Sequence, residues 1–101
     1  MLEITEEKQG TTLTIRPEGQ MNLTTSPDVA AKVTSEKLTG IEKLVFDLEK
    51  LDYLSSAGLR VFLSAVKAME GHGEVVIVNA GQEILDIFQL AGFANIATII
   101  E

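Results

Sequence analysis

The sequence predicts an α/β fold, a sheet with helices layered against it, in the order β-β-α-β-α-β-α-β. In segments 2–6 and 11–16, apolar and polar residues alternate as they do in half-buried strands. Beyond these segments, short apolar runs alternate with segments of helical periodicity, which is typical of a layered α/β architecture. The length of 101 residues suits one modest core, so we expect residues 1–101 to form a single domain.

The two opening strands are predicted to form a hairpin through a turn at residues 7–10, with a loop longer than two residues. Pro17 and Gly19 are expected to end its ladder. Thr25 and Ser26 are candidate N-caps for a helix over residues 27–38, which Gly40 terminates. The core side of that helix is expected to carry Val29, Ala30 and Val33.

The middle of the chain is predicted to form a strand over residues 43–48, followed by a helix that starts near Ser55 and Ser56. Helical spacing places five apolar residues toward the core: Leu59, Phe62, Leu63, Val66 and Met69. The outer side or flank is then formed by Ala57, Arg60, Val61 and Ser64. These residues either form an ordinary mixed surface or receive a partner.

The last third is predicted to contain a strand over residues 75–78, a helix over residues 83–91 and a short strand over residues 97–100. Asn79 and Gln82 are spaced as in a capping box, and Gly92 suits the end of the helix. The residues that this helix is expected to bury are Ile84, Ile87, Phe88 and Ala91.

Composition excludes several classes of function. Eight basic against 15 acidic residues give a net charge of −7, which argues against nucleic acid and anionic membrane surfaces as partners. No apolar run reaches the ~20 residues of a membrane span, and the first residues lack the features of a signal peptide. The absence of cysteine excludes disulfides and thiolate metal sites. We therefore expect a cytoplasmic protein.

Catalytic machinery is not apparent. Ser55 and Ser56 lack the Gly-x-Ser-x-Gly pattern of a nucleophile elbow. His72, the only histidine, lies beyond the far end of the helix, roughly 20 Å from Ser56 at the rise of an α-helix. Three nearby carboxylates could bind a hard cation, but a solvated loop is the favoured interpretation: Asp47, Glu49 and Asp52. We expect no enzyme activity, no cofactor and no metal.

The two serines are the unusual feature. One hydroxyl is enough to cap a helix, so Ser55 is the expected N-cap and Ser56 the first helical residue. A phosphate on Ser56 would meet the positive end of the helix dipole and add about −1.5 to −2 charge. The alternative is that both serines serve only the start of the helix.

The segment 51–59, Leu-Asp-Tyr-Leu-Ser-Ser-Ala-Gly-Leu, resembles the signature of STAS domains, the module shared by sulfate transporters and anti-sigma factor antagonists. Gly19 to Asn22 with Thr25 is similar to the family's Gly-x-Leu-Asp-x-x-Thr segment. A third similarity, to the family's Phe-x-x-(Ser/Ala)-Gly, is carried by Phe88, Ala91 and Gly92. The resemblance spans nearly the whole chain and implies a mixed β-sheet with helices mainly on one face.

The resemblance also implies a function. An anti-sigma factor antagonist binds, when dephosphorylated, an anti-sigma factor that is itself a serine-protein kinase, and so releases a sigma factor. The kinase ends the complex by phosphorylating the antagonist, and a PP2C-type phosphatase resets it. The residue matching the family's phosphoacceptor is Ser56, while Ser55, the second candidate, stands where the family has Asp. Asn22 also replaces a family Asp.

The expected partner-binding residues are Asn22, Thr25, Ser55, Ser56, Ala57 and Arg60. A different class of function stays open. The chain could be a constitutive STAS subunit of an ABC-type lipid-transport complex that uses the same surface without phosphorylation.

Overall fold

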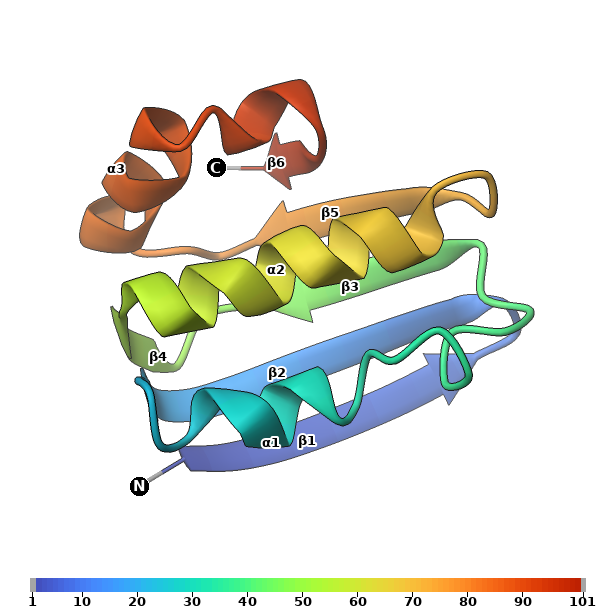
Figure 1. Cartoon of the computed structure of the whole chain (residues 1–101), viewed down its shortest axis with the longest axis horizontal. Coiled ribbons are helices and arrows are strands. Elements are labelled where there is room, and N and C mark those ends of the chain that lie inside the picture. Colours follow the sequence, from blue (N-terminus) through green and yellow to red (C-terminus); the bar gives the residue numbers. More distant parts are fainter. Residues whose placement is uncertain (1, 101) are drawn as a thin grey trace.

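A mixed sheet forms one layer of the molecule and carries the helices on one face, in a computed structural model that describes residues 2–100 (Figure 1). The strands are β1 (Leu2–Gln9), β2 (Thr12–Met21), β3 (Lys43–Asp47), β4 (Leu51–Leu54), β5 (Glu74–Val78) and β6 (Thr98–Ile100). Within the described residues, the six strands follow the order β1-β2-β3-β5-β6, and β4 pairs with β2. Among residues 2–100, β1 and β2 form the only antiparallel pair, and the other pairs are parallel. The predicted fold class is confirmed.

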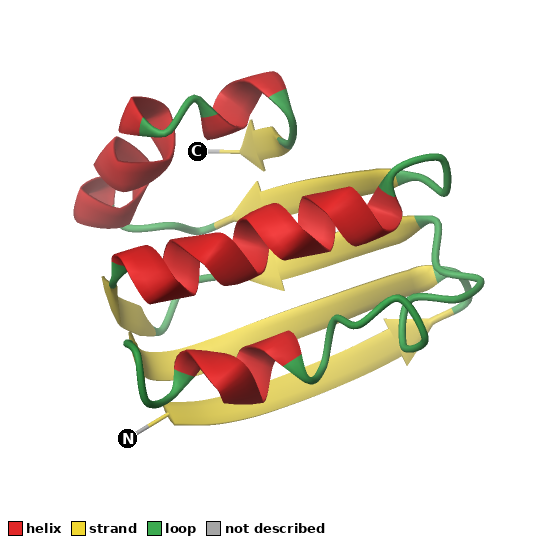
Figure 2. Ribbon diagram, in the orientation of Figure 1, coloured by secondary structure: helices red, strands yellow, loops and turns green. Residues whose placement is uncertain are grey.

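The helical elements are α1 (Ser26–Ala30), α2 (Ser56–Met69), α3 (Gln82–Leu90) and the 3₁₀ turn η1 (Phe93–Asn95). Figure 2 shows α1 and α2 lying along the strands, with α3 and η1 beyond β5. The N-termini of α1, α2 and α3 all lie at the end of the sheet where the parallel strands finish (Figure 1). No helix in the described part of the chain has the length and apolar character needed to cross a membrane.

The hairpin is tighter than the sequence predicts. Gln9 pairs with Thr12, so the loop contains two residues, and Gly10 adopts the positive φ of 61° that such turns require. The expectation of a longer loop was wrong because residues 7–9 are polar on both faces. β1 is an edge strand, and a run of polar residues on an edge strand has the same sequence pattern as a turn.

Pro17 and Gly19 do not end β2, which runs on to Met21. The other edge of β2 pairs with β3 up to Ile15 and with β4 from Gly19 onward, so Pro17 lies opposite the gap between them. The N–H of Gly19 donates to the carbonyl of Lys50 on that edge. Backbone N–H groups two residues apart on a strand point to the same side. An N–H at residue 17 would therefore face the gap between β3 and β4, so the proline there costs the sheet no hydrogen bond.

Strand β4 adds one element to the predicted order. Its residues do not alternate, because Leu51 and Leu54 are buried while Asp52 and Tyr53 between them are exposed. The register shifts between Gly19 and Gln20 on the partner strand, which is the irregularity that accommodates this pattern. The alternation of apolar and polar residues that indicates a strand is therefore absent from β4, and the sequence does not predict this strand.

Helix α1 is five residues long and gives way to turns, so the expected helix over residues 27–38 was too long. Thr34 and Thr39 make local side-chain bonds, to the N–H of Lys37 and the carbonyl of Ser35, which compete with helical bonds. Burial is nevertheless as predicted for Val29 and Val33, while Ala30 is half-buried.

The inward face of α2 is rotated from the prediction. Val61 is buried, whereas Leu63 is 37% exposed and Leu59 and Val66 are only half-buried. The buried residues of α2 are Gly58, Val61, Phe62, Ala65 and Met69. Phe62 lies at the centre, with ring centroids 4.6 Å from Phe46 of β3 and 5.3 Å from Phe88 of α3 in edge-on contacts. These rings hold α2 between the sheet and α3.

The predicted capping box of α3 is absent, since Gly81 is the N-cap and makes no side-chain cap bond. Asn79 instead has a φ of 58° and donates from Nδ2 to the carboxylate of Asp47. Ile84 and Phe88 are buried as predicted, but Ile87 is half-buried and Ala91 is exposed. Gly92 follows the helix in the left-handed conformation, as expected of a terminating glycine.

Candidate functional site

The end of β2 and the end of β4 bring two segments together that are far apart in sequence. Met21 pairs with Leu54, and the N–H of Ser55 donates to the carbonyl of Met21 at 2.9 Å. The loop that begins at Asn22 therefore lies directly beside the start of α2 (Figure 1). The residues singled out from the sequence at positions 22–25 and 55–60 share one end of the sheet.

Ser55 is the N-cap of α2, as the sequence predicts. Its φ of −89° and ψ of 174° are those of extended backbone, and its Oγ accepts a hydrogen bond of 3.2 Å from the N–H of Gly58. Its carbonyl accepts from the N–H of Leu59 at 2.9 Å, which closes the first turn. The side chain is half-buried. The hydroxyl of Ser55 is thus engaged in holding the helix start.

Ser56 is the first residue of α2, and its side chain is exposed. Within residues 2–100, no hydrogen bond involves its hydroxyl. The contrast with Ser55 is the central feature of the site, because two adjacent serines differ in whether the fold uses their side chains.

Gly58 sets the position of this helix start. A Cβ at residue 58 would lie 2.6 Å from Cδ1 of Leu54, 3.0 Å from Cβ of Met21 and 3.2 Å from the Met21 carbonyl oxygen. Only glycine allows α2 to approach the ends of β2 and β4 so closely. This contact turns residue 58 inward and leaves residues 56 and 60 facing out.

The loop beside Ser55 is closed by its own side chains. Oδ1 of Asn22 accepts from the N–H groups of Thr24 and Thr25, both at 3.0 Å. Oγ1 of Thr25 donates to the carbonyl of Gln20 at 2.6 Å and accepts from the N–H of Asn22 at 3.0 Å. Asn22 and Thr25 therefore fix the loop, and they present Leu23, which is 80% exposed, to solvent.

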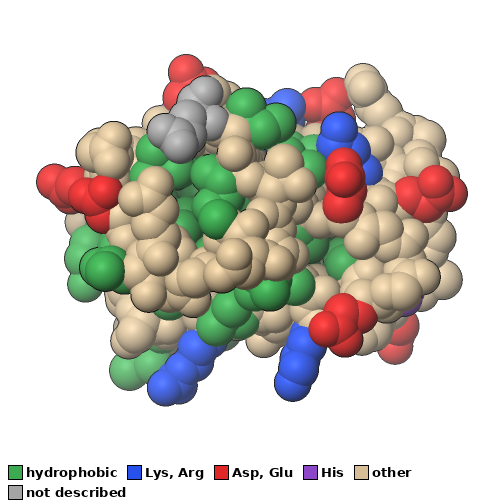
Figure 3. Space-filling view, turned by 90° about the horizontal axis from the view of Figure 1, so that it is seen from above, with side chains coloured by type: hydrophobic (Ala, Val, Ile, Leu, Met, Phe, Trp, Pro, Cys, Tyr) green, Lys and Arg blue, Asp and Glu red, His purple; other side chains and the backbone are tan. Residues whose placement is uncertain are grey.

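The outer side of α2 continues from Ser56. Ala57 is half-buried and Arg60 is exposed, and no carboxylate among residues 2–100 lies within 4.0 Å of Arg60. A hollow of about 490 Å³ follows, lined in part by Arg60, Leu63, Lys67 and Ile96. Figure 3 shows hydrophobic side chains at the surface beside Lys and Arg side chains. We call the set Leu23, Ser56, Ala57, Arg60, Leu63 and Ile96 the serine surface.

Sequence reasoning missed three members of the serine surface. Leu63 was assigned to the core, and Leu23 and Ile96 were given no role. Their exposed fractions of 37%, 80% and 49% depend on the rotation of α2 and on how loops end, which periodicity alone does not report.

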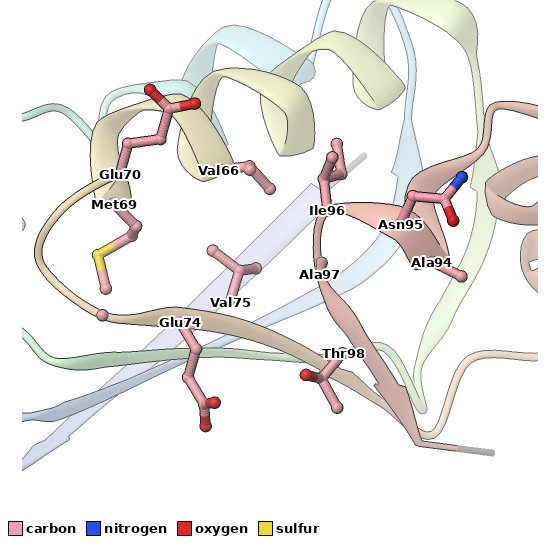
Figure 4. A pocket seen from close by; sticks show the side chains of 11 residues that line it. Val66, Met69, Glu70, Glu74, Val75, Ala94, Asn95, Ile96, Ala97 and Thr98 are labelled. Carbon is pink, nitrogen blue, oxygen red and sulfur yellow. The ribbon is translucent and has the colours of Figure 1, made fainter.

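The opposite end of α2 holds other features. A cavity of about 380 Å³ lies between the last turn of α2, the start of β5 and the segment before β6, with Met69, Val75 and Ala97 among its walls (Figure 4). His72 lies exposed in the turn that follows α2, far from Ser56 along the helix. Met69, Val75, Ala97 and His72 are not members of the serine surface, although Ile96 of that surface also lines this cavity.

The carboxylate of Asp47, at the end of β3, is engaged in structural contacts, whereas Glu49 and Asp52 are exposed. Oδ2 of Asp47 lies 3.4 Å from Nε of Arg16, and its Oδ1 accepts from Nδ2 of Asn79 at 3.1 Å. Glu7 pairs with the same arginine at 3.1 Å, so the network crosses the strands from β1 to the end of β5. Among the described residues, no group of three or more His, Cys, Asp or Glu could hold a metal ion.

The fold and this site define the chain as a small α/β module whose distinguishing feature is an exposed serine at the start of its central helix. The family model of the STAS domain matches residues 3–101. The chain belongs to the STAS domain family.

Individual relatives agree with this assignment. BtrV of Bordetella bronchiseptica, which carries the name of an anti-sigma factor antagonist, is 32% identical over 80 residues, covering 78% of this chain and 69% of BtrV. An anti-sigma factor antagonist structure from Mycobacterium paratuberculosis aligns with a TM-score of 0.87 and 16% identity, covering 98% of this chain and 85% of that one. Phosphorylated SpoIIAA from Bacillus aligns with a TM-score of 0.77 and 19% identity, covering 98% and 92% of the two chains.

Proposed function

We propose that this chain is an anti-sigma factor antagonist, and that phosphorylation of Ser56 switches it off. The observation that carries the proposal is that the fold uses the hydroxyl of one serine and not that of the other. Ser55 caps α2 through its hydroxyl, whereas the hydroxyl of Ser56 is exposed and free of hydrogen bonds within residues 2–100. A hydroxyl that the fold does not need is available to a kinase.

Relatives support this assignment. BtrV is named for anti-sigma factor antagonism, and SpoIIAA, an anti-sigma factor antagonist, has been solved in a phosphorylated form. The proposed partners are an anti-sigma factor that acts as a serine-protein kinase, and a PP2C-type phosphatase that removes the phosphate. The proposed location is the cytoplasm, where these partners act.

The phosphate acts locally in this mechanism. At the first position of α2 it meets the positive end of the helix dipole, so the domain keeps its fold. A partner that docks on the serine surface must remove water from Ser56 and from the apolar side chains around it. A phosphate of about −1.5 to −2 charge makes that desolvation costly, and the complex dissociates.

Ser56 is a better acceptor than Ser55 for a structural reason. The Oγ of Ser55 accepts from the N–H of Gly58 and is half-buried, so a kinase would have to open the first turn to reach it. Ser56 requires no such opening.

Intact and peptide mass spectrometry of the protein purified from its native cells tests the proposal. The expected result is one phosphate, mapped to Ser56, in a fraction of the molecules that changes with growth condition. A phosphate mapped to Ser55 would contradict the assignment of the acceptor. The absence of phosphate under all growth conditions would overturn the switch.

A further inference from the structure

Ser56 and Arg60 are four residues apart on α2, and both are exposed on its outer side. Side chains at this spacing on a helix lie next to each other, with Cβ atoms about 5–6 Å apart. The anionic position is the more N-terminal of the two, which is the favourable orientation for such a pair. Arg60 has no carboxylate within 4.0 Å among the described residues, so its guanidinium is available.

Several other charges at this end of the molecule are negative, and the cation Lys50, directly before β4, lies beside Glu49 and Asp52. Asp52 is exposed on β4, Asp28 lies in the first turn of α1 and Glu83 in the first turn of α3. The remaining cation on the outer side of α2 is Lys67, eleven residues from Ser56, or roughly 16 Å along the helix axis. Arg60 is thus the cation placed to pair with a phosphate on Ser56.

We propose that Arg60 is the intramolecular receptor of phosphoserine 56, so that phosphorylation adds negative charge and also masks the cation of the serine surface. This inference rests on the proposed phosphorylation of Ser56. Guanidinium binds phosphate through two parallel hydrogen bonds, which suits it to this role better than a lysine.

The pairing changes what a partner meets. In the unmodified chain, Arg60 stands beside Leu63 and presents a free positive charge to a carboxylate of the partner. In the phosphorylated chain, the same guanidinium turns one helical turn back toward residue 56 and is neutralised. One modification therefore removes an attraction and adds a repulsion.

The test uses the isolated protein with phosphoserine incorporated at position 56 during synthesis, so it needs no kinase. The pH titration of the phosphate is followed by ³¹P NMR in wild type, Arg60→Gln and Lys67→Gln. Pairing favours the dianion, so the wild-type midpoint should lie about 0.3 pH unit below that of Arg60→Gln at low salt. Lys67→Gln, which removes a charge from the same side of the helix, should match wild type.

Ionic strength adds a second readout. The difference between wild type and Arg60→Gln should shrink in 1 M salt, because the Debye length falls to about 3 Å. Equal titration midpoints in wild type and Arg60→Gln would overturn the pairing. A midpoint raised equally in Arg60→Gln and Lys67→Gln would overturn it too. Neither result bears on whether the phosphate releases the partner, which the affinity of the phosphorylated chain for the anti-sigma factor decides separately.

Discussion

The N–H of Ser55 donates a 2.9 Å hydrogen bond to the carbonyl of Met21, and this bond joins the start of α2 to the strand end from which the loop carrying Leu23 departs. Met21 is the last residue of β2 and is fully buried, so the bond ties the start of α2 to the core. The loop after Met21 and the helix after Ser55 leave the sheet together. The position of Ser56 is therefore set by backbone contacts rather than by its own side chain.

The two serines should differ in their effect on stability. Ser55→Ala removes the acceptor for the N–H of Gly58 and should lower the free energy of unfolding by about 1 kcal/mol. Ser55→Asp keeps an acceptor near the positive end of the helix dipole and should stay within about 0.5 kcal/mol of wild type. Ser56→Ala should also stay within about 0.5 kcal/mol. Urea denaturation measures all three, and an equal loss for both alanine variants would contradict this difference between the two serines.

Asn22 should act through its acceptor oxygen. Asn22→Ala leaves the N–H groups of Thr24 and Thr25 without their side-chain partner and should cost about 1–2 kcal/mol of unfolding free energy. Asn22→Asp keeps the acceptor and should cost less than about 0.5 kcal/mol. Thermal unfolding of the two variants at equal ionic strength separates the effect of losing the acceptor oxygen from the effect of adding a negative charge. If the aspartate variant were as unstable as the alanine variant, the loop would depend on the amide nitrogen instead.

The substitution Gly58→Ala should improve helix propensity but disturb the packing of α2. In an exposed helix interior, alanine in place of glycine gains about 1 kcal/mol. Here the new methyl group would lie 2.6 Å from Cδ1 of Leu54 and 3.0 Å from Cβ of Met21, so we expect a net loss of about 1–2 kcal/mol. Ser64→Ala, at an exposed position of the same helix, is the control and should gain a few tenths of a kcal/mol. A stabilised Gly58→Ala variant would show that α2 does not pack this closely on β2 and β4.

Leu63 should matter more for binding than for folding. Leu63→Ser removes apolar area from the serine surface, and the affinity for the anti-sigma factor should fall about 10-fold, as expected for a contact of about 1.4 kcal/mol. Leu90 is 91% exposed on α3 and lies outside that surface, so Leu90→Ser is the matched control and should bind as wild type does. Isothermal titration calorimetry measures both variants. Equal losses would mean that the interface is not the one described.

Sequence patterns predicted the elements whose local signal, an apolar run, an alternation or a capping residue, is strong. The hairpin, β3, β5 and the caps at Ser55 and Gly92 follow from local chemistry that needs no tertiary context. The patterns failed where the sheet overrides local preference. β4 is recognisable only through its pairing with β2 across a register shift.

The rotation of α2 could not be predicted for a related reason. Its apolar residues fit more than one inward face, and the choice depends on the close approach of Gly58 to Met21 and Leu54. That approach is a tertiary contact, which the sequence does not reveal. Helical spacing therefore predicts that Leu63 belongs to the core, although it lies at the surface. The serine pair could be singled out because capping requires one hydroxyl and the chain supplies two.

The affinity of the unmodified chain and of the chain carrying phosphoserine at position 56 for the anti-sigma factor tests the central claim most directly. Calorimetry should give a dissociation constant at least about 100-fold higher for the phosphorylated chain, with Ser56→Asp intermediate and Ser56→Ala binding like the unmodified chain. Circular dichroism should show the same fold for all four proteins. Equal affinity of the unmodified and phosphorylated chains would contradict the account, because a phosphate in the proposed interface must oppose docking.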